Sequence, residues 1–310
     1  RPGELAAQLD SIQDKLPIPL LVTIDQEGGT VNRLSPIKRW RETPSAQELQ
    51  NWSADSIHKY WSAAAHQLRE LHINTNLAPV LDPETNALGR PTFMAVRKRS
   101  YGDGAERIVP IASAFARAFQ ENGVQCVAKH FPGYDAETNS DHDIAVSHAD
   151  SEWIETSIET FRQLRPLIGG VMMSSIHYES LADEPAVFSP TMVSWAREAL
   201  GDIVVMTDDL WGTSLRSYML PGETIHRVEY PEEAFGRLVT AAVKAGNDML
   251  MITFPRKVPG MIDTIVELAR NDEGVRAHVD AAARRILACK ERNGLFVTRP
   301  PKYGSRVVAQ

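Results

Sequence analysis

The 310 residues, of which 43% are hydrophobic and 24% charged, have the composition of an ordinary globular protein with a large core. A formal net charge of −7 without long basic runs argues against a nucleic-acid or anionic-membrane partner. No apolar run reaches the roughly 18 residues needed to cross a bilayer, so we expect a soluble protein. Two cysteines are too few for a disulfide framework, and Cys126 lies among apolar residues as a core side chain would.

The chain opens on Arg1-Pro2-Gly3-Glu4, with neither an initiator methionine nor an apolar signal core. We therefore expect it to be trimmed at the N-terminus, which leaves its localisation open, with the cytoplasm favoured. The first element we expect is a helix over Glu4 to Leu16, where apolar residues recur at helical spacing.

Short apolar runs then alternate with helical patterns of ten to twenty residues, which is typical of βα units and a parallel sheet. Most of these runs are apolar throughout, as expected for strands buried on both faces. The strands predicted in this way are Leu20 to Ile24, Asn76 to Leu81, Val124 to Ala128, Gly170 to Ser174, Ile203 to Met206 and Asp248 to Thr253.

Capping signals separate the helices from the strands. Ser45-x-x-Glu48 is a capping box, and it predicts a single helix that continues with Leu49, Trp52 and further apolar residues to Leu68. Asp103-x-x-Glu106 predicts the next start. Further along, Ser189-Pro190 predicts a helix to Leu200, and Gly246 ends one that begins at Glu232. Without an internal repeat or a low-complexity linker, we expect residues 1–310 to form a single domain.

Four polar segments follow predicted strands, where an α/β barrel keeps its chemistry. The first contains Asp25, Gly28, Gly29 and Arg33; Asp25 could bind vicinal sugar hydroxyls or simply cap a helix. In the second, Arg-Ser-Tyr-Gly, Arg99 could orient a ligand through paired hydrogen bonds or form a surface ion pair.

The third segment is Lys129-His130-Phe131-Pro132-Gly133, with His142 thirteen residues after the lysine. Neighbouring side chains of a strand point apart, so Lys129 and His130 could both face a ligand only if the strand is distorted. His130 could otherwise be a buried structural histidine. The fourth segment contains Asp208 and Asp209, which could also cap the following helix.

Together these segments resemble glycoside hydrolase family 3, in particular its single-domain β-N-acetylhexosaminidase branch. The resemblance implies a (β/α)8 TIM-type barrel whose first strand is either missing from this chain or replaced by a different closure. It also implies that Asp208 is the nucleophile and Asp209 structural. Sugar binding is implied for Asp25, Arg33, Arg99, Lys129 and His130.

The same branch uses a loop histidine as acid/base, held by an aspartate in Asp-Ser-His. An ungapped count from Lys129 places that histidine on His142 and replaces its aspartate partner with Ser140. A histidine can alternate between acid and base near neutral pH, with Ser140, Asp141 or Asp143 as its possible orienters. A shifted alignment would instead place Asn139-Ser140-Asp141 on Asp-Ser-His. Other departures are Thr30 for an arginine, Tyr134 for a loop histidine and Ser175 for a strand-end histidine.

The resemblance therefore predicts a retaining exo-β-glycosidase, with terminal β-linked N-acetylglucosamine as the favoured substrate. The alternatives are a β-glucosidase-like activity of the same family and a catalytically impaired carbohydrate-binding barrel. We expect a carbohydrate as the partner and no cofactor. The histidine spacing in Asp141-His142-Asp143 and His148 matches no established metal site. The stretch from Trp211 to Tyr230 is expected to be irregular, either beside the leaving group or as a plain surface loop.

Overall fold

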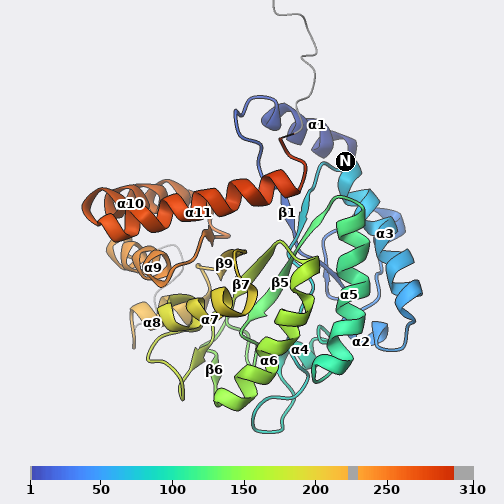
Figure 1. Ribbon diagram of the computed structural model, residues 1–310, viewed down its shortest axis with the longest axis horizontal. Helices are drawn as coiled ribbons and strands as arrows, with labels where there is room; N and C mark the ends of the chain where they lie inside the picture. Colours follow the sequence, from blue (N-terminus) through green and yellow to red (C-terminus); the bar gives the residue numbers. More distant parts are fainter. Residues whose placement is uncertain (1, 223–229, 297–310) are drawn as a thin grey trace, which may run out of the picture.

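The computed structural model describes residues 2–222 and 230–296, and its centre is a curled parallel sheet of six strands (Figure 1). All neighbours in the sheet run parallel. Each of the six predicted strands is present, with bounds that differ by a few residues. In spatial order they are β1 (Thr23–Ile24), β4 (Thr75–Asn76), β5 (Gln125–Phe131), β7 (Gly170–Met173), β9 (Val204–Asp209) and β10 (Met249–Met251).

The alternation of side chains along the strands divides the core into two parts. A small separate cluster lies on one face of the sheet, with one or two residues from each of five neighbouring segments. It consists of Leu77, Val127, Met172 and Met206, with Met249 and Met251 packed against them. The alternate residues, such as Cys126, Val171 and Val205, join the large cluster that includes the helices. Both faces are apolar because both are covered, which explains why the predicted strands lack an alternating pattern.

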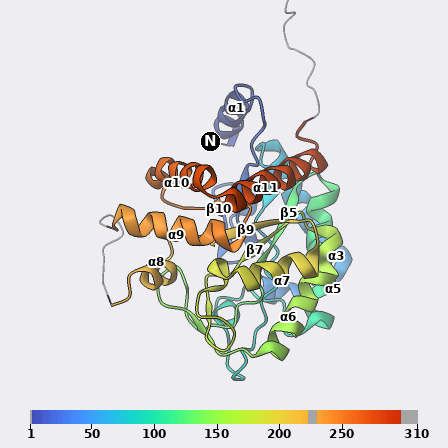
Figure 2. The same cartoon turned by 60° about the vertical axis from the view of Figure 1, so that its left-hand side comes forward.

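The helices form a belt around the sheet in which α3, α5, α6, α7, α9, α10 and α11 contact one another in chain order (Figure 2). Their apolar faces are turned inward, and Trp61 and Phe115 pack together between α3 and α5. None of the helices within residues 2–222 and 230–296 is long and apolar enough to span a bilayer. The helices are α1 (Pro2–Gln13), α2 (Ala46–Leu49), α3 (Ala54–Glu70), α4 (Phe93–Val96), α5 (Ala105–Glu121), α6 (Ser151–Leu164), α7 (Pro190–Leu200), α8 (Thr213–Met219), α9 (Glu232–Ala245), α10 (Val258–Asn271) and α11 (Glu273–Arg292).

The caps of α2, α7 and α9 are confirmed, whereas two other helix predictions are wrong. The Ser45 capping box is formed, but α2 ends after one turn and Ser53 caps a separate helix, α3. Asp103 does not open α5, whose N-cap is Gly104. The Asp103 carboxylate accepts hydrogen bonds from Thr85 instead, so a tertiary contact replaces the local one.

The sheet is a half-barrel and not the closed eight-stranded barrel that the resemblance implies. Among the described residues, β1 and β10 are the two edges of the sheet and do not pair with each other. The other strands form two small separate sheets: β2 (Gln26–Gly28) pairs antiparallel with β3 (Val31–Asn32), and β6 (Val146–Ser147) pairs parallel with β8 (His177–Tyr178). The expected first helix is present as α1.

Candidate active site

A pocket of about 300 Å³ lies at the carboxyl ends of the strands and brings together most of the residues singled out in the sequence. Strand ends meet there because all six strands run in one direction. Its walls include many charged side chains. The residues expected from the sequence that line it are Asp25, Arg33, Arg99, Lys129, His130, Ser140, Asp141 and Asp208.

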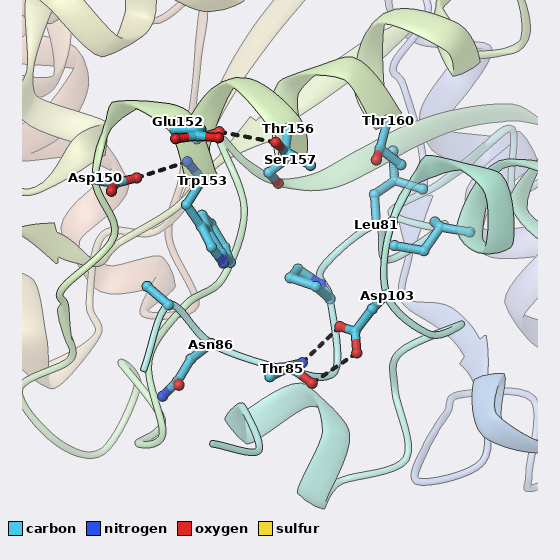
Figure 3. Close-up of a pocket in the computed structure, with 14 residues that line it drawn as sticks. Leu81, Thr85, Asn86, Asp103, Asp150, Glu152, Trp153, Thr156, Ser157 and Thr160 are labelled. Atoms are coloured by element: carbon cyan, nitrogen blue, oxygen red, sulfur yellow. Dashed lines mark hydrogen bonds between the residues drawn. The ribbon is translucent and has the colours of Figure 1, made fainter. Parts of the chain in front are cut away.

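A cavity of about 570 Å³ elsewhere in the protein has different walls (Figure 3). It lies between the loop after β4 and the start of α6, and Trp153 forms part of its wall. Asp103 and Asp150 line it, but their carboxylates accept hydrogen bonds from Thr85 and from the Trp153 backbone. These two carboxylates therefore serve the local fold, and no catalytic or sugar-binding residue expected from the sequence lines the cavity.

A buried ion-pair network forms one wall of the strand-end pocket. Lys129 Nζ lies 2.7 Å from Asp25 Oδ1 and 2.6 Å from Glu27 Oε1. Arg99 binds the Glu27 carboxylate through two hydrogen bonds of 2.8 and 2.9 Å. Burial would raise the pKa of Glu27, but the charges of Arg99 and Lys129 outweigh burial and lower it to about 2. Glu27 is thus a fixed anion that keeps two cations in place.

His130 is held between two carboxylates. Its Nδ1 lies 2.7 Å from Asp82 Oδ2, and its Nε2 lies 3.9 Å from Asp208 Oδ2. The other oxygen of the fully buried Asp82 accepts hydrogen bonds from the backbone N–H groups of His130 and Tyr134. Asp82 therefore fixes both the ring and the backbone of His130, which directs Nε2 into the pocket.

Lys129 and His130 both line the pocket although they are neighbours on β5. The strand is irregular at this point: the peptide bond between them is cis, and the register with β7 shifts between Lys129 and Phe131. Strand β5 is therefore distorted here, as was required for both side chains to face the pocket.

The two adjacent aspartates at the end of β9 have different surroundings. Both oxygens of Asp209 accept hydrogen bonds from Thr253, and one also binds the Trp211 N–H, so this carboxylate joins β9 to the segment after β10. Within residues 2–222 and 230–296, Asp208 accepts a single hydrogen bond, from the Asp209 N–H, and it lines the pocket. Burial, together with the negative charge of Asp141, raises the pKa of Asp208, and the positive charges of His130 and Lys129 partly offset this.

Only the first part of the loop of residues 139–143, up to Asp141, lines the pocket. Asn139, Ser140 and Asp141 line the pocket, whereas His142 and Asp143 are exposed and do not. Within residues 2–222 and 230–296, the His142 imidazole has no hydrogen bond or ion pair, so none of Ser140, Asp141 and Asp143 orients it in this conformation. The roles assigned to these residues stay predictions.

Two arginines at the pocket have free guanidinium groups. Arg33 and Arg97 line it, both are exposed, and neither forms an ion pair with another residue of the described part of the chain. Arg33 was expected from the sequence, and Arg97 was not. Thr30, which stands where the family has an arginine, also lines the pocket.

Sequence reasoning missed two buried carboxylates, Glu27 and Asp82. Glu27 lies two residues after Asp25 in a segment that was already singled out. A second carboxylate in that segment was a usable signal for a partner of Lys129. Asp82 was not singled out as a site residue, yet it is fully buried against His130. Its partner is 48 residues away in the chain, and no local pattern reports such a contact.

Comparisons with known proteins identify the family of the chain. The Glycosyl hydrolase family 3 N terminal domain matches residues 4–289. Beta-hexosaminidase LpqI of Mycobacterium tuberculosis is 28% identical over 291 residues, covering 89% of this chain and 69% of LpqI. The beta-hexosaminidase of Tolumonas auensis is 28% identical over 262 residues, covering 80% of this chain and 71% of that protein.

Among solved structures, the beta-N-acetylhexosaminidase from Beutenbergia cavernae superposes with a TM-score of 0.78 at 28% identity. The superposition covers 92% of this chain and 84% of that one. The resemblance seen in the sequence motifs is thus confirmed over most of the chain. The chain belongs to glycosyl hydrolase family 3 and is a glycosidase.

Proposed function

We propose that this protein is a retaining exo-β-glycosidase that removes terminal β-linked N-acetylglucosamine. The observation that carries the proposal is Asp208, a half-buried carboxylate at a strand end that accepts one hydrogen bond within the described part of the chain and has an open pocket in front of it. The names of the relatives support N-acetylglucosamine as the sugar. A pocket of about 300 Å³ is at the small end of ligand sites and suits one sugar unit at a chain end.

In this mechanism, Asp208 attacks the anomeric carbon as the glycosidic bond breaks, and the leaving oxygen takes a proton from an acid in the pocket. Water then attacks the glycosyl-aspartate, gives its proton to the same group as a base, and releases Asp208 as a carboxylate. Retention follows because two displacements occur at one carbon. The sequence assigns the acid/base to His142, and this assignment stays a prediction.

The remaining pocket residues suit sugar binding. Lys129, Asp25 and Arg99 present charged donors and acceptors in fixed positions, since ion pairs hold each of them. The free guanidinium of Arg33 adds donors, and His130 Nε2 faces the pocket. We further propose that residues 1–310 form one catalytic domain and that the half-barrel is a variant of the closed eight-stranded barrel, since it gathers strand ends around one site in the same way.

The first test is hydrolysis of para-nitrophenyl β-N-acetylglucosaminide by the unaltered protein and by Asp208→Asn. We expect turnover in the former and a loss of at least about a thousandfold in the latter, because the nucleophile is removed. Asp263→Asn, which removes an exposed carboxylate on α10, is the matched control and should retain activity. Sugar binding without turnover in the unaltered protein would instead support the impaired binding barrel, and preference for the glucoside would support the β-glucosidase alternative.

Three further measurements address the mechanism. A fluorinated N-acetylglucosaminyl fluoride that slows the second step should leave the sugar attached to Asp208, detectable by mass spectrometry of the peptide. Because the pKa of Asp208 is raised, the acidic limb of the kcat/KM profile should have its midpoint above the ordinary aspartate value of 3.8. An α-anomer as the first product in NMR would rule out retention.

A further inference from the structure

One carboxylate at the wall of the strand-end pocket, that of Asp141, lies on the loop that follows β5. The Asp141 residue is exposed whereas the Asp208 side chain is only 16% exposed, which places Asp141 nearer the mouth of the pocket than Asp208. The mouth is where the departing part of a substrate would lie if its terminal sugar filled the pocket. The negative charge of Asp141 acts on Asp208, and both charges act on Tyr134.

Backbone hydrogen bonds hold Asp141 at this position. The carbonyl of Asp141 accepts hydrogen bonds from the N–H and the hydroxyl of Thr213, at 3.1 and 2.9 Å. The carbonyl of Ser140 accepts one from the Ser214 N–H, and the Ser140 N–H donates to the Tyr134 hydroxyl. Helix α8 starts at Thr213, shortly after β9, the strand that carries Asp208. The loop of residues 139–143 is therefore anchored to the segment that follows Asp208.

Contact with Gly212 makes this docking close. A Cβ at Gly212 would lie 3.3 Å from the Ser140 carbonyl oxygen and 3.7 Å from Asp141 Cα. The loop therefore packs on the backbone between β9 and α8. In contrast, His142 and Asp143 point away from the pocket wall and are exposed.

The other acidic groups of the pocket already have partners. Asp25 and Glu27 bind Lys129, and Glu27 also binds Arg99. Asp209 is bound to Thr253 and to a backbone N–H. The Tyr134 hydroxyl donates to the Thr138 carbonyl, and burial raises its pKa. The remaining charged groups, Arg33, Arg97 and Arg99, stay protonated and cannot exchange a proton with a leaving group.

His130 is a further titratable group near Asp208. Its Nδ1 is bound to Asp82 and its Nε2 faces the Asp208 carboxylate at 3.9 Å, on the floor of the pocket. From there it can stabilise the nucleophile, whereas Asp141 lies on the side from which a leaving group departs.

We propose that Asp141 is the general acid/base of this glycosidase in place of a loop histidine. The inference rests on the proposed function. In the first step the Asp141 carboxyl gives its proton to the glycosidic oxygen, which takes the electron pair of the breaking bond, while Asp208 bonds to the anomeric carbon. In the second step the Asp141 carboxylate removes a proton from water as water attacks and Asp208 leaves. Asp141 returns to its protonated form, and the sum is hydrolysis.

The discriminating variants are Asp141→Asn and Asp141→Ala, with His142→Ala for the rival assignment and Asp263→Asn as the surface control. For Asp141→Asn we expect kcat/KM on diacetylchitobiose, whose leaving oxygen needs a proton, to fall by about 10²–10⁴-fold. On a dinitrophenyl glycoside, which needs none, the first step should be nearly unchanged. The basic limb of the pH profile should disappear in Asp141→Asn and persist in His142→Ala.

Azide provides a readout that a structural defect cannot imitate. It needs no general base, so it should accelerate turnover of the dinitrophenyl glycoside by Asp141→Ala and yield the β-glycosyl azide, while Asp208→Asn stays inactive. The same leaving-group dependence and azide rescue in His142→Ala, with normal chitobiose hydrolysis by Asp141→Asn, would overturn the proposal. An unaltered protein that hydrolyses neither substrate would refute the proposed function itself, which is a different outcome.

Discussion

At the scale of single residues, the site depends on carboxylates that differ in their partners. Glu27 is neutralised by two cations, Asp82 is bound to His130, Asp209 is bound to backbone and Thr253, and Asp208 is nearly unpartnered. Their chemistry follows from these contacts, because opposite charges lower a carboxyl pKa and burial without partners raises it. One residue type thereby supplies both the fixed charges and the group proposed to react.

Replacing Glu27 with glutamine should destabilise the protein by about 3–5 kcal/mol at pH 7, because the largely buried Arg99 would lose its carboxylate partner and the buried Lys129 would lose one of its two. Urea unfolding of the unaltered protein and of Glu27→Gln measures this difference. Glu159→Gln on the exposed face of α6 is the control, with an expected change below about 1 kcal/mol.

The Glu27 effect should also depend on pH in a defined direction. The pKa of Glu27 is lowered from 4.5 to about 2 on folding, so its stabilising contribution is present above about pH 4.5 and is lost as the pH falls toward 2. The gap in unfolding free energy between the two proteins should therefore narrow over that interval. A gap that stays constant from pH 7 to pH 3 would contradict the assigned ion pairs.

At the scale of elements, the short helix α8 links β9 to the loop of residues 139–143. The segment from Trp211 was expected to be irregular, but Thr213–Met219 is helical; residues 223–229 of the same stretch lie outside the described part of the chain. Its first residues bind the carbonyls of Ser140 and Asp141. A movement of α8 would therefore move the loop relative to Asp208.

Thr213→Val removes the side-chain donor to the Asp141 carbonyl and the acceptor of a hydrogen bond from Arg216 Nη2, but leaves the backbone N–H in place. We expect kcat/KM on diacetylchitobiose to fall by about tenfold, since the loss of one hydrogen bond of about 1 kcal/mol loosens the loop. Stability should change by no more than about that amount. Thr264→Val, whose hydroxyl binds a carbonyl within α10, is the control. Unchanged kinetics in Thr213→Val would show that the backbone contacts suffice.

At the scale of the whole molecule, a belt of helices compensates for a sheet that does not close. The sheet edges β1 and β10 remain apart, yet the large core extends from Leu34 to Val275 and covers the helix-facing side of the strands. Aromatic side chains between α3 and α5 contribute much of this core, with Trp61 in contact with Phe115 and Phe119. The fold thus depends on helix packing as much as on strand pairing.

Trp61→Ala should lower the unfolding free energy by about 3–5 kcal/mol, because the side chain is fully buried and would leave a cavity. Trp52→Ala is the matched control: its side chain is 37% exposed, and we expect a change of about 1 kcal/mol. Thermal or urea unfolding measures both. Equal losses in the two variants would contradict the assigned packing of α3.

The sequence by itself determined the class of fold, the six strands and the residue types of the site. Apolar runs, the Ser45 and Ser189 caps and the segments around Lys129 and Asp208 are local patterns, and local patterns survive without knowledge of the fold. The tertiary structure alone decided the partners of Glu27 and Asp82, the open edges of the sheet, and which member of the loop faces the pocket. The periodicity of a helix or a strand relates residues that are only a few positions apart in the sequence. The contacts that hold Asp141, and not His142, at the pocket wall join residues more than 70 positions apart. The acceptors are backbone carbonyls, which every residue carries.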